Sequence, residues 1–195
     1  MYLITYQNES SNKVKITLIY CIMKLNDIVM FASSDGGHFA EMAALSSLFS
    51  KYDSVILTDN KRADKSIPGF EKVKAIEFAM AFAERRDKLR DTKKGTITEL
   101  DYATCYFKLY RQCKRAFKLY KPKVVISAGA GISVPLCLVA KLYGAKFIHI
   151  ENKAKVYSKT ISGRLVQQLA DMIIVQWPEM VDVYKGKASY FGILA

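Results

Sequence analysis

Short apolar runs alternate along this 195-residue chain with stretches in which apolar residues recur three or four positions apart. Short runs bounded by turn residues are typical of buried strands, whereas the wider spacing predicts amphipathic helices. The first run begins at Ile28, and the later ones occupy residues 54–57, 73–78, 124–127, 146–150, 172–175 and 188–191. Strands that alternate with helices predict an open parallel α/β sheet, with ligands bound at the carboxyl ends of its strands.

Helices are expected between these runs. Directly after the first strand, apolar residues have helical spacing at Phe39, Met42, Leu45 and Phe49. A long helix should begin near Thr98, after a break at Gly95 and Thr96, and should end before Pro122, which cannot continue a helix. One face of this helix carries Tyr102, Tyr106, Leu109, Cys113, Phe117 and Tyr120. The segment 79–94 before it is basic and loosely helical in pattern.

Capping residues mark the helices of the second half. Ser133 is expected to cap a helix whose first turn contains Pro135 and whose carboxyl end is capped by Gly144. Two further helices are expected, one at residues 162–170 and a short one that begins at Trp177 and Pro178.

Residues 1–22 have a different composition from the rest of the chain. A polar stretch at residues 7–13 precedes an apolar run at 16–23, which is too short to cross a bilayer, since a spanning helix needs roughly 20 apolar residues. No small-residue cleavage site follows it. A leader, an extra strand and a wrongly assigned start all stay open for residues 1–22, and residues 23–195 are expected to form one domain.

The net charge of +12 predicts an anionic partner, such as nucleic acid, a phosphorylated substrate or an acidic membrane surface. Between residues 85 and 123 there are 13 Lys or Arg against four Asp or Glu, so this stretch carries +9 of the +12. Interleaved aromatic residues favour a position at a membrane surface, and a solvated helix face is the alternative. The residues expected to face the membrane are Arg85, Arg86, Arg111, Lys114, Arg115 and Lys118.

Cysteine and histidine usage argues against two classes of protein. The four cysteines have no C-x-x-C spacing, and the chain has just two histidines. This argues against a zinc site and against a disulfide scaffold, and it favours a reducing, cytosolic compartment. We therefore expect no metal site.

Two glycine-rich loops, each after a strand, are the candidate binding elements. In the first, Gly36 and Gly37 precede His38. Glycine lets backbone N–H groups approach a phosphate closely, and a helix amino end behind the loop favours an anion. The second loop contains Gly129 and Gly131. A tight turn with an exposed histidine is the alternative for the first loop, and close helix–strand packing is the alternative for the second.

Taken together in order, these motifs resemble a known family. They are SSDGGH at residues 33–38 with Glu41, GAGISVP at 129–135, IEN at 150–152, SGRL at 162–165, AD at 170–171 and VQWPE at 175–179. Over about residues 24–195 the chain resembles the membrane-associated, acceptor-side subunit of two-part glycosyltransferases. That family includes the anchoring subunit of dolichyl-diphosphate N-acetylglucosamine transferase and its bacterial counterparts in capsule and exopolysaccharide synthesis.

The resemblance implies a Rossmann-like domain equivalent to the N-terminal, acceptor lobe of a GT-B glycosyltransferase. It implies that this chain binds a polyprenyl-diphosphate-linked sugar at the cytoplasmic face of a membrane. A separate partner chain would bind the UDP-sugar donor, no other cofactor would be needed, and this chain would be inactive alone. The reaction would be metal-independent and inverting. The sequence departs from eukaryotic members in lacking a clear N-terminal transmembrane helix, and in having Asn152 where a serine is common.

Roles for single residues follow from the resemblance. His38 is the first candidate for the catalytic base, and Glu151 is the second. The residues expected to contact the acceptor diphosphate are Ser33, Ser34, Gly36, Gly37, Gly129, Gly131, Ser133 and Asn152.

Other side chains keep two interpretations. Glu41 either orients His38 or is a solvated carboxylate of the first helical turn. Glu151 either serves the sugar or forms a surface ion pair with Lys153 or Lys155. His149 alternates with apolar neighbours in a strand, which favours a core position. Trp177 suits either a lobe interface or the core.

Two functions of other classes are rivals to the transferase subunit. A nucleic-acid-binding module could use the basic helix, but no nucleic-acid motif accompanies it, so no nucleic-acid partner is expected. A nucleotide-binding dehydrogenase is disfavoured because the first loop does not have the G-x-G-x-x-G pattern.

Overall fold

The computed structural model describes residues 4–6, 14–16, 27–82 and 98–194. Its main sheet contains seven strands in the order β5-β4-β3-β6-β7-β8-β9, and every neighbouring pair is parallel. The strands are β3 (Ile28–Ser33), β4 (Asp53–Thr58), β5 (Ala75–Phe78), β6 (Val124–Ser127), β7 (Lys146–Ile150), β8 (Met172–Val175) and β9 (Ala188–Tyr190). The predicted open parallel α/β sheet is therefore confirmed, and the strand order is that of a Rossmann-like fold.

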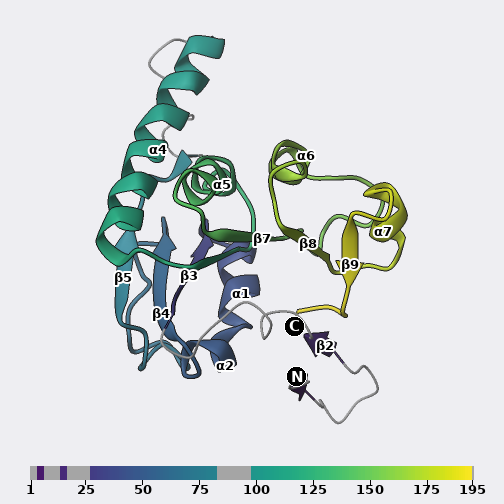
Figure 1. Ribbon diagram of the computed structural model, residues 1–195, viewed down its shortest axis with the longest axis horizontal. Coiled ribbons are helices and arrows are strands. Elements are labelled where there is room, and N and C mark those ends of the chain that lie inside the picture. The colour runs from purple at the N-terminus through teal and green to yellow at the C-terminus, as the bar shows by residue number, and fades with distance from the viewer. Residues whose placement is uncertain (1–3, 7–13, 17–26, 83–97, 195) are drawn as a thin grey trace.

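Helices cover both faces of this sheet (Figure 1). Helices α1 (Gly37–Ala43) and α2 (Ser46–Phe49) pack on one face. The other face is covered by α4 (Glu99–Tyr120), α5 (Ser133–Leu142) and α6 (Ile161–Val166), while α7 (Glu179–Val183) packs beside β9. Both faces of the central strands are thus buried, which explains why those strands consist of continuous apolar runs.

Among the described residues, two large apolar clusters lie one on each face of the sheet, and a smaller third cluster joins α7 to β8 and β9. Met30 and Ala32 of β3 point toward α4 and α5, whereas Val29 and Phe31 point toward α1 and α2. This alternation follows from the two-residue repeat of a strand.

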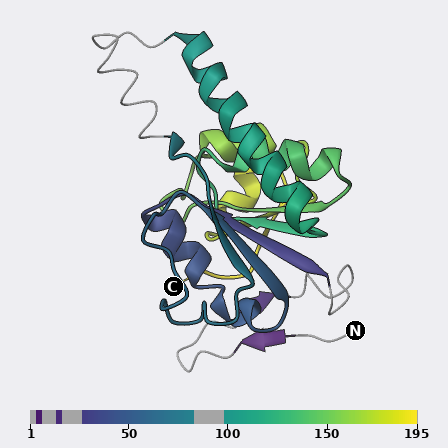
Figure 2. The ribbon, with the colours of Figure 1, turned by 90° about the vertical axis from the view of Figure 1, so that its left-hand side faces the viewer.

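Helix α4 begins and ends as its sequence predicts. Thr98 and Asp101 form a reciprocal capping box at its start, and Lys121 adopts a left-handed conformation just before Pro122. Its buried stripe consists of Cys105, Leu109, Cys113, Ala116 and Phe117. The expected apolar face was wrong in one part, because Tyr102 is exposed and, with Tyr106, contacts Phe82 instead of the sheet. Figure 2 shows the first turns of α4 extending beyond the body of the domain.

Three local predictions need correction. Ile132, not Ser133, occupies the capping position of α5, because the Ser133 hydroxyl is buried and lies 2.6 Å from the Ser127 hydroxyl. Strand β5 begins at Ala75 rather than at residue 73, and α6 ends at Val166 rather than at residue 170. The expected helical segment 79–94 lies outside the described residues from position 83 onward.

A separate two-stranded antiparallel sheet is formed by β1 (Ile4–Tyr6) and β2 (Val14–Ile16). It does not pair with the seven-stranded sheet. Among the described residues, no helix combines the length and the apolar character that a membrane span requires.

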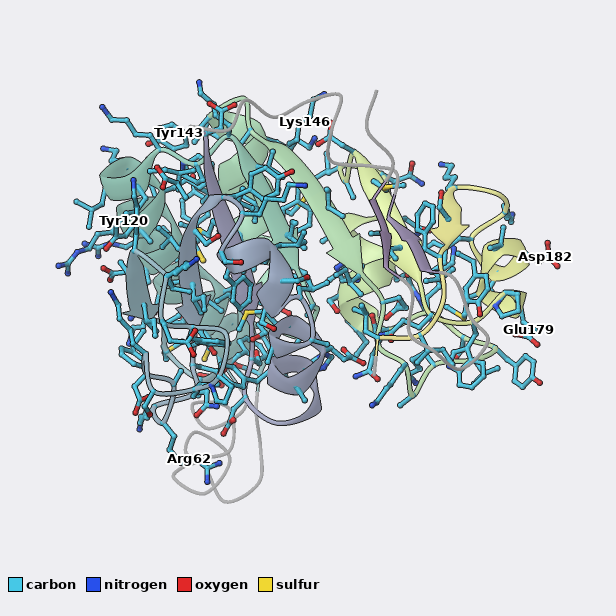
Figure 3. The ribbon with its side chains drawn as sticks, turned by 90° about the horizontal axis from the view of Figure 1, so that it is seen from below. Arg62, Tyr120, Tyr143, Lys146, Glu179 and Asp182 are labelled. Atoms are coloured by element: carbon cyan, nitrogen blue, oxygen red, sulfur yellow. The ribbon has the colours of Figure 1, made fainter. Side chains whose placement is uncertain are left out.

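The order of the strands creates a crevice at the carboxyl ends of the central strands. From β3 the chain proceeds outward to β4 and β5, and it then returns to place β6 on the other side of β3. The loops after β3 and β6 therefore diverge, and a ligand site is expected between them. In Figure 3, Arg62 after β4 marks this carboxyl edge, whereas Lys146 at the start of β7 lies at the opposite end of the strands.

Candidate functional site

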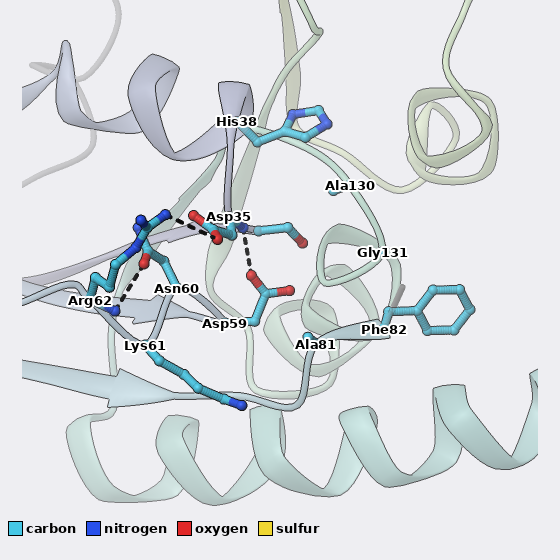
Figure 4. Close-up of a pocket in the computed structure, with 11 residues that line it drawn as sticks. Asp35, His38, Asp59, Asn60, Lys61, Arg62, Ala81, Phe82, Ala130 and Gly131 are labelled. Carbon is cyan, nitrogen blue, oxygen red and sulfur yellow. Dashed lines mark hydrogen bonds and ion pairs between the residues drawn. The ribbon is translucent and has the colours of Figure 1, made fainter. Parts of the chain in front are cut away.

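A pocket of about 650 Å³ opens at the carboxyl ends of β3, β4, β5 and β6. In Figure 4, His38 and Ala130 lie at one end of it and Lys61 lies at the other. The lining residues are Ser34, Asp35, His38, Asp59, Asn60, Lys61, Arg62, Ala81, Phe82, Ala130 and Gly131. The pocket thus lies where the strand order reverses, and both predicted glycine loops contribute to it.

His38 links the two loops of the crevice. Its Nδ1 atom lies 2.8 Å from the carbonyl oxygen of Ala128. Because a carbonyl can only accept a hydrogen bond, Nδ1 carries the proton and donates it. In the neutral ring, Nε2 therefore holds a lone pair, which is the form that a general base needs.

Two further side chains reach the imidazole. The Oε2 atom of Glu41 lies 3.6 Å from Nδ1, and the Nδ2 atom of Asn152 lies 3.3 Å from Nε2 and 3.5 Å from Nδ1. Burial alone would lower the pKa of His38, but Glu41, the Ala128 carbonyl and the charge of Glu151 together raise it above its ordinary value. Glu41 is buried, so its interpretation as a solvated carboxylate was wrong, and its position beside Nδ1 fits the orienting role.

Two glycines of the second loop leave space for neighbouring rings, His38 at Gly129 and Phe82 at Gly131. Gly129 has a φ of +101°, and a Cβ atom there would lie 3.1 Å from the His38 ring. A Cβ at Gly131 would lie 2.9 Å from Phe82. In the first loop Gly36 has a positive φ of +77°, whereas Gly37 is the first residue of α1, and a Cβ at either would have no atom within 4 Å.

Carboxylates already use two N–H groups of the first loop. The Asp35 N–H donates to Asp59 over 2.5 Å, and the Gly36 N–H donates to the Asp35 side chain over 2.8 Å. The backbone N–H groups of the next two residues, Gly37 and His38, have no hydrogen-bond acceptor within the described part of the chain. Any anion at this loop would therefore find its donors at Gly37 and His38.

The run 59–62 after β4 supplies the polar wall that the residue assignments missed. Burial raises the pKa of Asp59, and the negative charge of Asp35 raises it further. Hydrogen bonds from the Asp35 N–H and from Ser34 act in the opposite direction but do not cancel the rise. Arg62 lies 3.9 Å from Asp35. The rule that ligands bind at strand carboxyl ends would have found these residues, because they directly follow a predicted strand.

Of the predicted site residues, Ser34, His38 and Gly131 line the pocket, and three others are buried away from it. Ser33 is buried, and its hydroxyl donates to the sulfur of Met42. Ser133 is buried against Ser127. Glu151 is 1% exposed, so the surface ion pair considered for it was wrong.

Glu151 instead fastens the chain that follows β7. Its carboxylate accepts hydrogen bonds from the Asn152 N–H, the Thr160 N–H and the Tyr184 hydroxyl. Burial and the Glu151 carboxylate raise the pKa of Tyr184. These bonds engage both Glu151 oxygens, which makes His38 the better placed of the two candidate bases.

His149 is fully buried in β7, as its alternation with apolar residues predicts. Neither of its ring nitrogens has a hydrogen-bond partner within the described residues. Burial lowers its pKa to about 4, so the ring is neutral at neutral pH.

The basic face of α4 forms a separate groove of about 460 Å³. Four of the six cations expected at a membrane line it with two aromatic residues: Phe107, Tyr110, Arg111, Lys114, Arg115 and Lys118. Arg85 and Arg86 lie outside the described residues. Phe107 is 61% exposed, so the groove presents an apolar surface between its charges.

Comparison with known families decides the membership of this chain. Residues 28–194 match the family described as "Oligosaccharide biosynthesis protein Alg14 like". The chain belongs to the Alg14 family. Mouse (Mus musculus) "UDP-N-acetylglucosamine transferase subunit ALG14" is 23% identical over 180 residues, which cover 84% of this chain and 81% of the mouse protein.

Solved structures share the fold. MurG of Acinetobacter baumannii superposes with a TM-score of 0.57 at 15% identity, covering 78% of this chain and 42% of MurG. UDP-N-acetylglucosamine 2-epimerase of Rickettsia bellii gives 0.59 at 12% identity, covering 87% of this chain and 45% of the epimerase. The chain thus spans less than half of either protein, and the expected correspondence with one Rossmann-like lobe of a GT-B enzyme is confirmed.

Proposed function

We propose that this chain is the acceptor-binding half of a two-chain UDP-N-acetylglucosamine transferase. Membership of the Alg14 family and the name of the mouse relative support the transferase. A partner chain would carry the UDP-sugar, since the mouse relative is named as a subunit of such a transferase, and this chain would be inactive alone. A nucleic-acid-binding module and a nucleotide-binding dehydrogenase are both disfavoured by the family match.

The placement of His38 is the observation that carries the proposal for the site. The ring lies at the crevice between β3 and β6, with its Nδ1 proton held by Ala128 and with Glu41 beside it. A polyprenyl-diphosphate-linked sugar would place its acceptor hydroxyl near Nε2. Asn152, 3.3 Å from Nε2, would then donate to the oxygen of that hydroxyl.

In the proposed reaction the hydroxyl oxygen attacks the anomeric carbon of the donor sugar as its proton passes to His38 Nε2. The bond from that carbon to UDP breaks, and UDP leaves with the electron pair, which inverts the configuration of the carbon. The negative charge of Glu41 stabilises the imidazolium that forms. Such proton transfer contributes about 10²–10⁴ to a rate.

The variant His38→Ala, measured in the complex with the donor subunit, tests this role. We expect kcat to fall by about 10²–10⁴-fold with little change in the acceptor KM, because the lost contact matters most in the transition state. A loss confined to acceptor KM would assign His38 to binding only. Unchanged kcat and KM would remove His38 from the site.

We propose further that the α4 groove holds the chain at the cytoplasmic face of an anionic membrane. Arg111, Lys114, Arg115 and Lys118 lie on one groove with exposed Phe107 between them. Each basic residue near an anionic surface contributes ~1 kcal/mol, so replacing all four by Gln should weaken vesicle binding by roughly a thousandfold at low salt.

A charge-matched variant separates this groove from the overall charge of the chain. Replacing four exposed lysines of loops outside α4 by Gln removes the same charge: Lys65, Lys72, Lys185 and Lys187. Binding to phosphatidylserine vesicles is measured by co-sedimentation at two salt concentrations. Equal losses in the two variants would contradict a dedicated α4 surface.

A further inference from the structure

Gln176 directly follows β8 and is 1% exposed, yet all of its polar atoms are bonded. Its Nε2 donates to the carbonyl of Glu151 over 2.9 Å and to Oε1 of Glu41 over 3.2 Å. Its Oε1 accepts from the backbone N–H of Leu194 over 3.0 Å. Because an N–H can only donate, Leu194 fixes the oxygen end of the amide and turns the NH₂ group toward Glu41.

The carboxylate of Glu41 is held by one of its oxygens. Oε1 accepts from Gln176 and from the Lys153 N–H, the latter over 2.8 Å. Oε2 has no hydrogen-bond partner within the described residues, and it faces Nδ1 of His38 at 3.6 Å. The direction of Oε2 toward the imidazole therefore depends on the two donors that hold Oε1.

Gln176 also holds a second segment that reaches the imidazole. It binds the Glu151 carbonyl, and its neighbour Trp177 donates its indole N–H to the Lys153 carbonyl over 2.6 Å. Asn152 lies between these two anchored residues, and its Oδ1 accepts from the Ala154 N–H. This bond turns the Asn152 NH₂ group toward the His38 ring, where its nitrogen lies 3.3 Å from Nε2 and 3.5 Å from Nδ1.

We propose that Gln176 is a positioning residue, whose amide holds Glu41 beside Nδ1 of His38 and holds Asn152 against the same ring. The consequence for catalysis rests on the proposed role of His38 as the base. The effect of Gln176 on the position of the His38 ring does not rest on that role, and it can be measured without turnover.

Two substitutions of nearly the same size separate the contacts of Gln176. Gln176→Met removes the donor and the acceptor together. Gln176→Glu keeps an acceptor for Leu194 but replaces the donor with a carboxylate oxygen that repels Glu41. If Gln176 acts through Glu41, both variants are impaired; if it only anchors Leu194, Gln176→Glu is close to wild type. Gln168→Met, at an exposed glutamine, is the matched control.

The first measurement is ¹⁵N NMR of the imidazoles in the purified chain. Only two histidines contribute, and His149 is identified by its loss in His149→Leu. The charged and titratable groups near His38 are Glu41 on α1 and Glu151 and His149 from β7. We expect neutral His38 to be protonated mainly at Nδ1 in the wild type, and to gain the Nε2-protonated form in both Gln176 variants. An unchanged ratio in folded variants would overturn the proposal.

The second measurement is kcat in the complex with the donor subunit. A small displacement of a catalytic group costs up to about 10²-fold, but Gln176 acts through Glu41, so we expect each Gln176 variant to lose about as much kcat as Glu41→Gln, roughly 3- to 10-fold, with an unchanged KM for the UDP-sugar. In a Glu41→Gln background the same change should cost little more, because the two residues act in one chain of contacts. Fully multiplied losses would overturn the proposal. A changed NMR ratio together with a fully active His38→Ala complex would instead contradict only the proposed base.

Discussion

His38 and His149 are the two histidines of the chain, and their surroundings are opposite. His38 lies at the end of the sheet beside Ala128, Glu41 and Asn152. Burial alone would lower its pKa, but Glu41, the Ala128 carbonyl and the Glu151 charge raise it. His149 lies inside β7, in the middle of the sheet, and its ring has no hydrogen-bond partner in the described part of the chain. Burial lowers its pKa to about 4. One ring can therefore exchange a proton near neutral pH, while the other stays neutral.

The difference comes from the backbone around each ring. Inside β7 the peptide groups bond to β6 and β8, so no polar group remains for His149. Where β6 ends, the Ala128 carbonyl turns toward His38, and Gly129 leaves space for the ring. A histidine at the end of a strand can thus exchange a proton with a ligand, whereas one inside the strand cannot.

Replacing His149 gives the largest effect that this comparison predicts. Its folded-state pKa is lowered, so the unfolded chain takes up the proton first and stability falls as pH drops from 6.5 toward 4. That loss amounts to about 3 kcal/mol at pH 4. In His149→Leu, urea unfolding at pH 7 and pH 4 should show a difference in stability smaller by about this amount. A difference equal to that of the wild type would contradict a buried neutral ring.

His38 should have the opposite linkage. Its folded-state pKa is raised, so its contribution to stability is complete below the ordinary histidine pKa and is lost as pH rises through the raised value. The two histidine variants should therefore change the pH dependence of stability in opposite directions.

Gly129→Ala should displace the His38 ring by adding a single carbon atom beside it. The added Cβ lies 3.1 Å from Nδ1 and Cε1 of His38, so the ring must move. We expect kcat of the complex to fall by about 10²-fold, the cost of a misplaced catalytic group.

Gly144→Ala provides the control for backbone strain. Gly144 has a φ of +72°, but a Cβ there would meet nothing within 4 Å. This variant should lose stability with kcat unchanged. Equal losses of kcat in the two variants would mean that strain, rather than the contact with His38, limits the rate.

Glu41→Gln is predicted to have the smallest effect, a displacement of the pH profile. The negative charge of Glu41 helps to raise the pKa of His38, so its removal lowers that pKa. A base acts in its neutral form, and the rise of kcat with pH should therefore move to lower pH, with a modest change in the plateau. An unmoved profile would mean that Glu41 does not act on the titrating group.

The sequence was sufficient to predict the sheet and the two loops. The runs 124–127, 146–150 and 172–175 coincide with β6, β7 and β8, because strands buried on both faces leave uninterrupted apolar stretches. Thr98 and Pro122 likewise marked the ends of α4, since capping and termination depend on neighbouring residues.

Side-chain partners could not be predicted in the same way. Lys153 binds Glu41 across 112 positions, and Gln176 binds Glu41 across 135. Ser33 and Ser133 belong to the loop motifs but point into the core, a direction that follows from strand parity and helix packing rather than from residue type. Arg111 and its neighbours were predictable as a charged face, because a helix repeats its own pattern locally.

The carboxylates of the first loop have a consequence for what that loop selects. Since Asp59 and Asp35 accept from the Asp35 and Gly36 N–H groups, an incoming phosphate oxygen can use these donors only when a carboxylate releases them. The phosphate then gains only the difference in free energy between its own hydrogen bond to the N–H group and the bond that the carboxylate gives up. Such competition disfavours ligands with a single anionic oxygen and rewards those with several. The loop would therefore discriminate by density of negative charge, and its own side chains would set the threshold.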